Sequence, residues 1–158
     1  MLIENDKRGS KNKLQLLYSR EKFHVPSNVY LIGMMNTADR SLAMLDYALR
    51  RRFAFFDLKP GFDSDGFVSY REGLGCTKLN ELVDCVKRLN DEISADDTLG
   101  EGFCIGHSYF CGMRAEDVTD AKLTAIVEYE LVPMLREYWF DDPAKVREWS
   151  AALRRAIR

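Results

Sequence analysis

The sequence predicts an α/β segment followed by an all-helical segment, with a boundary near residue 61. Two short apolar runs, residues 28–35 and 53–58, have the pattern of strands buried on both faces of a parallel sheet. A stretch with helical spacing separates them, and this strand, helix, strand order is typical of a right-handed βαβ unit. After Pro60 the apolar residues recur only with helical spacing.

The residues before the first predicted strand are mostly polar. Residues 1–8 predict the end of a helix that stops at Gly9, and residues 9–27 predict a loop or hairpin ending at Pro26. Because the chain would then begin inside a helix, we expect it to be cut from something longer.

The helix between the two predicted strands ends in three consecutive arginines. Asp39 or Ser41 can cap its start, and it finishes at Arg50, Arg51 and Arg52. The helix dipole favours cations at this end, which accounts for one or two of the three. Since adjacent like charges repel one another, the run indicates an anion nearby. One helix lies between these arginines and the end of the first strand, so the anion is expected on a neighbouring subunit.

The second segment predicts three helical stretches around one irregular stretch. Residues 77–93 carry a cap at Thr77 and an apolar face made of Leu79, Leu82, Val83, Val86, Leu89 and Ile93. Residues 94–118 are irregular and contain "GEGFCIGHSYF". Residues 119–139 are helical, with a kink or break expected at Pro133. Asp142 and Pro143 then begin a further helix.

Composition restricts the class of protein. The chain has 158 residues, 46% of them hydrophobic, and a net charge of −2, so it is not a nucleic-acid polycation and any anion site must be local. No apolar run is long enough to span a bilayer, and no signal-peptide pattern is present. A cytoplasmic protein with reduced thiols and no membrane partner is therefore expected.

Two of the four cysteines flank a histidine, which raises the question of a metal site. Cys104, His107 and Cys111 have the spacing C-x2-H-x3-C, which matches none of the usual zinc patterns, and no second ligand pair follows. We therefore expect no metal, and we expect the cysteines to be small buried side chains.

Polar residues follow the first predicted strand directly. Ligands bind beyond the carboxyl ends of the strands in an open parallel sheet, and Asn36 lies at that end. Its amide can hold a water or a phosphate oxygen. Thr37, Asp39 and Arg40 continue the same turn. An equally good interpretation is that these residues only make the turn and cap the helix.

The stretch "MNTADRS" followed by "LDYALRRRF" resembles the McrB family, the GTPase subunits of modified-cytosine-specific restriction systems, which belong to the AAA+ class. The resemblance continues in "ENDKR" at 4–8, "VPSNVYLIG" at 25–33, "PGFD" at 60–63, "IGHSYF" at 105–110 and "FDDP" at 140–143. It implies an AAA+ core segment over residues 1–61 and a helical lid domain over residues 62–158.

The resemblance also implies roles for single residues. Asn36 matches the sensor-1 asparagine that helps place the attacking water, and Asp39 and Arg40 complete the signature turn. Arg51 and Arg52 match the arginine-finger region, with Arg52 the preferred finger. Where relatives carry a second sensor arginine, this chain has His107 and Ser108. The alternative for His107 is a hydrogen-bonded residue in a turn of the lid.

Two nucleotide-anchoring motifs are missing from this sequence. No glycine is followed by lysine, so no phosphate loop of the form G-x-x-x-x-G-K-[ST] exists, and no apolar strand ends in a magnesium-binding acidic pair. The interpretation is a C-terminal fragment of an McrB-like protein that does not hydrolyse nucleotide alone. The intact protein would use GTP and Mg²⁺, and neither is expected to bind this fragment tightly.

The resemblance implies partners as well. These are neighbouring McrB-like subunits in a ring, an McrC-like nuclease subunit, and DNA bound through a domain absent here. The alternative function is an inactive interaction module that occupies a ring interface. Direct DNA binding through Arg147, Arg154, Arg155 and Arg158 is disfavoured, because Asp141, Asp142 and Glu148 balance those charges.

Overall fold

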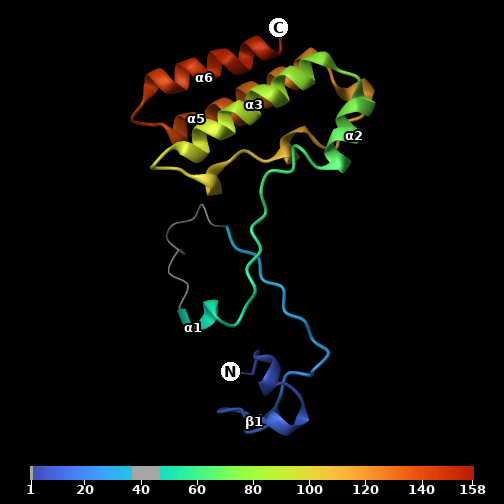
Figure 1. The fold of residues 1–158 in the computed structure, drawn as a ribbon, viewed down its shortest axis with the longest axis vertical. Helices are drawn as coiled ribbons and strands as arrows, with labels where there is room; N and C mark the ends of the chain where they lie inside the picture. Colours follow the sequence, from blue (N-terminus) through green and yellow to red (C-terminus); the bar gives the residue numbers. More distant parts are fainter. Residues whose placement is uncertain (1, 37–46) are drawn as a thin grey trace. The chain divides into compact units, whose positions relative to one another are not determined.

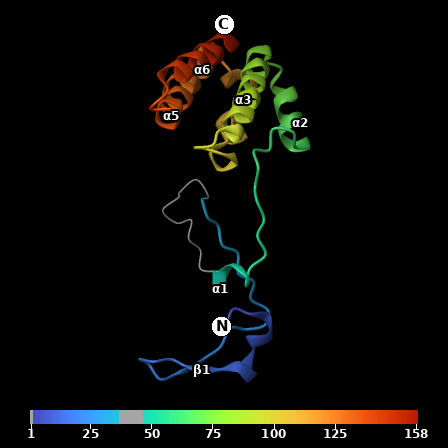
Figure 2. The same ribbon diagram turned by 60° about the vertical axis from the view of Figure 1, so that its left-hand side comes forward.

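A computed structural model of the chain describes residues 2–36 and 47–158, and it divides into two compact units, Met1–Asp57 and Leu58–Arg158. Figures 1 and 2 show the small elements of the first unit and the long helices of the second. None of the helices in the described residues is long and apolar enough to cross a membrane.

The described residues of the first unit form only short elements. These are the 3-10 turns η1 (Asn5–Lys7) and η2 (Ser10–Asn12), the strands β1 (Leu14–Gln15) and β2 (Lys22–Phe23), and the short helix α1 (Tyr47–Arg50). The strands pair antiparallel, with Leu14 opposite Phe23. Of the two possibilities expected for residues 9–27, a loop or a hairpin, the structure shows the hairpin. The helix end expected over residues 1–8 is reduced to the 3-10 turn η1.

Arg8 ties the start of this unit to a later segment. Its Nε and Nη2 donate to the carbonyl of Ile3 at 3.0 and 2.8 Å, and its Nη1 donates to the carbonyl of Val29. Gly9, with φ of +90°, donates its N–H to Val25 at 2.8 Å. Backbone and side-chain hydrogen bonds hold these residues, since no described residue of the unit is buried.

The predicted βαβ unit is not formed among the described residues. Residues 28–35 and 53–58 form no strand, and Tyr30, Ile32 and Met34 are 87, 92 and 97% exposed. A strand of a parallel sheet needs neighbouring strands at its edges and helices over its faces. The described residues supply neither, so the apolar runs stay extended and uncovered. Much of the helix expected between them falls on residues 37–46, outside the described residues.

The second unit is a helical domain with a continuous core. Its helices are α2 (Asp65–Leu74), α3 (Thr77–Ala95), α4 (Asp120–Ala125), the π-helix η7 (Ile126–Leu131), α5 (Val132–Tyr138) and α6 (Pro143–Ala156). Three 3-10 turns, η4 (Glu101–Phe103), η5 (His107–Phe110) and η6 (Ala115–Asp117), lie in the stretch expected to be irregular. In both views α3 lies between α2 on one side and α5 and α6 on the other (Figures 1 and 2).

Helix α3 supplies the central face of the core, as the spacing predicts. All six apolar residues expected on that face are buried, together with Cys85 and Asn90. The expected cap is wrong by one residue. Cys76 is the N-cap and Thr77 is the first helical residue.

The break at Pro133 takes a specific form. Proline has no N–H, so the carbonyl four residues before it loses its helical partner. The helix passes through the π-helix η7, where Val132 donates its N–H to Val127, five residues earlier. Leu123, Val127 and Leu135 remain buried on the core side of this interrupted helix. Asp142 then caps α6 by accepting the N–H of Lys145 at 3.0 Å, and Pro143 is its first residue, as expected.

Candidate functional site

The three arginines at the end of α1 have three different environments. The guanidinium carbon of Arg50 lies 5.3 Å from the ring centroid of Phe55, a cation–π contact. Arg51 is exposed and makes no side-chain hydrogen bond or ion pair with any described residue. Arg52 is partly buried and is paired. Arg50 and Arg51 are both exposed, and of the three arginines Arg51 has no side-chain partner among the described residues.

Arg52 is held by two oxygens of its own unit. Its Nε forms an ion pair with the Glu4 carboxylate, and its Nη1 donates to the carbonyl of Ala48 at 2.5 Å. The hydrogen bond from Arg52 keeps the pKa of Glu4 below its usual value. For Nε of Arg52 to bind a phosphate, phosphate oxygens would have to replace the Glu4 carboxylate. The pairing joins residues 48 positions apart, which no local pattern in the sequence reveals.

The other predicted residues of this unit are placed only in part. Asn36 is exposed at the end of the 28–36 segment. Thr37, Asp39 and Arg40 lie outside the described residues.

His107 and Ser108 begin η5 in the helical unit. The Nδ1 atom of His107 accepts the backbone N–H of Gly61 at 3.0 Å. The imidazole lies edge-on to Phe67 and Phe62, with ring centroids 5.4 and 6.2 Å away. Ser108 is exposed, and its Oγ makes no hydrogen bond among the described residues. Of the two interpretations offered for His107, this geometry matches the hydrogen-bonded residue in a turn.

The segment that carries His107 is fixed to the core by Asn90. The Asn90 amide donates to the carbonyl of Ile105 at 2.9 Å and accepts the N–H of Ile105 at 2.7 Å. Tyr70 does the same for Met113, with both of its hydroxyl hydrogen bonds at 2.8 Å. Neither Asn90 nor Tyr70 was predicted from the sequence to have this role. A polar Asn within the apolar face of α3 was the available signal.

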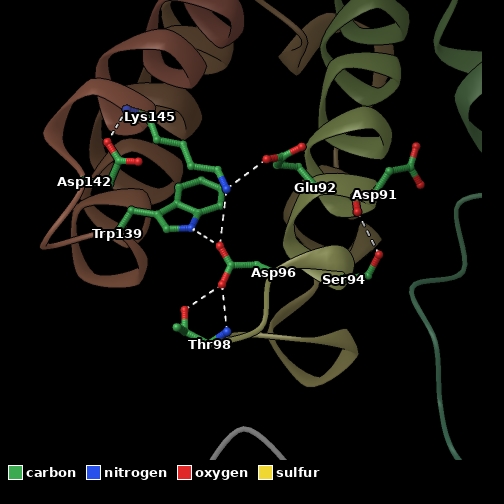
Figure 3. A network of polar contacts seen from close by, with 8 residues as sticks. All are labelled: Asp91, Glu92, Ser94, Asp96, Thr98, Trp139, Asp142 and Lys145. Carbon is green, nitrogen blue, oxygen red and sulfur yellow. Dashed lines mark hydrogen bonds and ion pairs between the residues drawn. The ribbon is translucent and has the colours of Figure 1, made fainter.

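A second feature that the sequence analysis missed is the Asp96 network, which comprises Glu92, Asp96, Thr98, Trp139 and Lys145 (Figure 3). Asp96 accepts the Thr98 hydroxyl at 2.6 Å, the Thr98 N–H at 2.9 Å and the Trp139 indole N–H at 2.8 Å. Lys145 lies 2.9 Å from Glu92 and 3.3 Å from Asp96, above the Trp139 ring. The network connects the end of α3 to the start of α6.

These contacts stabilise the ionised form of Asp96. The hydrogen bonds from Thr98, followed by that from Trp139, hold the pKa of this carboxyl well below its usual value. Within the described residues, the partners of Asp96 (Thr98, Trp139 and Lys145) all belong to the helical unit. We therefore regard the network as structural, holding the end of α3 to the start of α6.

The cysteines were expected to be buried, and this is confirmed for Cys85 but not for the other three. Cys85 is buried, Cys76 and Cys104 are half-buried, and Cys111 is exposed. The Sγ of Cys111 donates to the carbonyl of His107 at 3.4 Å. Within residues 2–36 and 47–158, no three His, Cys, Asp or Glu side chains gather in the way a metal ion requires.

Comparisons with known proteins show similarity over nearly all of the chain. Residues 81–147 match the family model described as McrB, alpha-helical lid domain. A protein of Escherichia coli (strain K12), named type IV methyl-directed restriction enzyme EcoKMcrB subunit, is 49% identical over 97% of this chain. The chain spans 35% of the length of that relative. Residues 81–147 therefore belong to the McrB alpha-helical lid domain family, and the similarity to McrB extends over nearly all of the chain.

Proposed function

We propose that this chain supplies the sensor-1 residue, the trans-acting arginines and the lid of an McrB-like GTPase in a methyl-directed restriction system. The observation that carries the proposal is the 49% identity to a methyl-directed restriction subunit over 97% of the chain. That alignment covers nearly the whole sequence.

The exposure of Arg51 supports a role outside its own chain. An arginine that enters the site of a neighbouring subunit stabilises charge on a transferring phosphoryl group, and such a residue contributes roughly 10³ to 10⁵ in rate. A guanidinium also bridges two phosphate oxygens, which a lysine does not. Arg52 remains the preferred finger from the resemblance, and it would exchange Glu4 for phosphate when it acts.

The remaining site residues take supporting roles in the proposal. Asn36 would place the attacking water, with Thr37, Asp39 and Arg40 in the same turn. His107 and Ser108 stand where relatives carry a second sensor arginine. Residues 28–35 and 53–58 would become strands when the rest of an AAA+ core provides neighbouring strands, since their apolar sequence fits a sheet covered on both faces.

The proposal includes a cofactor and partners that this chain would meet only in the intact assembly. GTP and Mg²⁺ would be held by a phosphate loop, and the sequence contains no G-x-x-x-x-G-K-[ST] run. The partners would be McrB-like subunits in a ring and an McrC-like nuclease subunit, with DNA bound through another domain. The site of action would be the cytoplasm.

A mixing experiment tests the proposal directly. A full-length McrB-like protein whose own finger arginines are replaced by alanine binds GTP without turnover. We expect added chain to restore phosphate release, and we expect the Arg51→Ala and Arg52→Ala chains to restore less of it. The exposed Arg147→Ala chain, changed on α6, is the matched control and should behave like the unchanged chain.

The same mixture separates the two candidate functions. Association without restored turnover, together with lower turnover of an unmutated McrB-like protein, would favour an inactive interaction module. No association at all would contradict both. In the McrB-like protein itself, replacement of the residue that aligns with Arg52 should leave GTP binding nearly intact and abolish hydrolysis. Equal loss of both would make that arginine structural.

A further inference from the structure

Residues 59–64 form the turn through which the chain enters the helical unit. Hydrogen bonds to the backbone of Gly61 hold this turn. The N–H of Gly61 donates to Nδ1 of His107 at 3.0 Å. The carbonyl of Gly61 accepts the Ser64 hydroxyl at 2.8 Å and the Ser64 N–H at 3.2 Å. Both backbone polar groups of Gly61 are therefore hydrogen-bonded. The partner of its N–H is a side chain 46 positions away in the sequence.

The fit between Gly61 and His107 is close. A Cβ added at Gly61 would lie 3.1 Å from Cε1 of His107, which is tighter than ordinary carbon contacts. Phe62 and Phe67 flank the imidazole edge-on, at interplanar angles of 72 and 77°. Phe62 and Phe67 are themselves buried. The position of the imidazole is thus restricted on the turn side by Gly61 and around its edge by two buried rings.

His107 is in turn connected to the centre of the unit. Asn90 on α3 holds Ile105 through two hydrogen bonds, and Ile105 is two residues before His107. Phe110, at the other end of η5, is fully buried. A continuous path therefore runs from α3 through Asn90, Ile105 and His107 to Gly61.

We propose that His107 is a positioning residue. By accepting the Gly61 N–H, it fixes the backbone of the turn that links the helical unit to Arg50, Arg51 and Arg52. The inference rests on the proposed function, because its effect on activity is measured through the phosphate release that the arginines are proposed to support. It assigns His107 to the support of residues 59–64 within the helical unit and not to direct contact with nucleotide. The hydrogen bond requires a lone pair on Nδ1 of His107.

The first test measures the hydrogen bond in the 158-residue chain. His107→Phe keeps an aromatic ring and removes the acceptor. His107→Asn loses the ring but retains an acceptor oxygen at the δ position. We expect the Gly61 amide to exchange with solvent about five- to tenfold faster in His107→Phe, and nearly as in the unchanged chain in His107→Asn. Ser108→Ala, at an exposed neighbour, should leave the exchange rate of the Gly61 amide unchanged.

A second variant covers the case in which His107→Phe does not fold. Gly61→Ala places a methyl group against the imidazole and leaves the core residues untouched. It should likewise accelerate amide exchange at residue 61, while amides of α3 keep their protection. If residue 61 stays as protected in Gly61→Ala and His107→Phe as in the unchanged chain, the positioning role is wrong.

The second test uses the mixture with the arginine-deficient McrB-like protein. We expect His107→Phe to lower the maximal rate of restored phosphate release about fivefold or more and to leave the half-saturating chain concentration unchanged. His107→Asn should recover the rate. An unchanged chain that restores no turnover would contradict the proposed function. An active unchanged chain with an equally active His107→Phe variant would contradict only the role of His107. A change confined to the half-saturating concentration would also contradict it.

Discussion

Asn90 and Ile105 exchange two hydrogen bonds, at 2.9 and 2.7 Å, so that a side chain of α3 acts as the backbone partner of an irregular segment. The amide of asparagine carries one donor and one acceptor group in the same arrangement as a peptide. Asn90 is buried, and so is Ile105. This pairing replaces the secondary structure that residues 104–106 lack, and it holds η5 against the core.

Replacement of Asn90 by alanine should be among the costliest polar substitutions in the lid. It removes two hydrogen bonds and leaves the N–H and carbonyl of buried Ile105 without partners, so we expect a loss of about 2–4 kcal/mol in the free energy of unfolding. Urea unfolding followed by circular dichroism measures this loss. Asn80→Ala on the same helix is the control, because the Oδ1 of Asn80 is buried with no partner among the described residues. Equal losses in the two variants would contradict the prediction.

The Asp96 network should make stability depend on pH in the acid range. The pKa of Asp96 lies below its usual value of 3.8 in the folded protein, so the folded state binds fewer protons than the unfolded state. The stabilisation is therefore complete above the unfolded-state pKa and is lost as the pH falls through it toward the folded-state pKa. Asp96→Asn should cost about 1.5–3 kcal/mol at neutral pH, because it weakens hydrogen bonds to a charged acceptor.

Urea unfolding of both chains between neutral pH and about pH 3 checks this dependence. The difference between the unchanged chain and Asp96→Asn should narrow from about pH 5 downward. Asp97→Asn is the control, since Asp97 is exposed and its side chain makes no hydrogen bond within the described residues. A difference that stays constant with pH would mean that the ionised form of Asp96 is not specially stabilised.

The helices of the lid could be predicted from the sequence because their determinants are local. The spacing of Leu82, Val86 and Leu89 marks the buried face of α3, and Asp142 followed by Pro143 marks the start of α6. Pro133 marks the interruption, although no rule of spacing predicts that it takes the form of a π-helix. Capping and periodicity act within a few residues, so a single sequence contains them.

The contacts between distant residues could not be predicted in the same way. Arg52 pairs with Glu4, and Gly61 pairs with His107, although the partners lie 48 and 46 positions apart in the sequence. Local sequence patterns do not reveal such contacts. The predicted strands failed for a related reason. The apolar run of residues 28–35 has the composition of a buried strand, but burial requires neighbours, and composition does not supply them.

Tyr70 offers a second test of how the irregular segment is held. Its hydroxyl both donates to the carbonyl and accepts the N–H of Met113, each at 2.8 Å. Tyr70→Phe removes both hydrogen bonds and keeps the ring, so we expect a loss of about 1–3 kcal/mol in the free energy of unfolding. Tyr109→Phe is the matched control, because within residues 2–36 and 47–158 the Tyr109 hydroxyl meets only the sulfur of Met134, at 4.0 Å. Comparable losses in the two variants would show that the Met113 contact contributes little.

The exposure of residues 28–35 leads to a last prediction, which contrasts two aliphatic residues. Leu89 is fully buried on α3, and its replacement by alanine should cost about 2–5 kcal/mol of unfolding free energy, because it removes packed atoms and leaves a cavity. Ile32 is 92% exposed, so Ile32→Ala should change the stability of this chain by less than about 0.5 kcal/mol. In an intact McrB-like protein, the residue that aligns with Ile32 should instead behave like Leu89, since a complete sheet would bury it. Thermal unfolding of both variants in both proteins measures the contrast. A large loss from Ile32→Ala in the 158-residue chain would mean that residues 28–35 are already packed as a buried strand without the rest of the sheet.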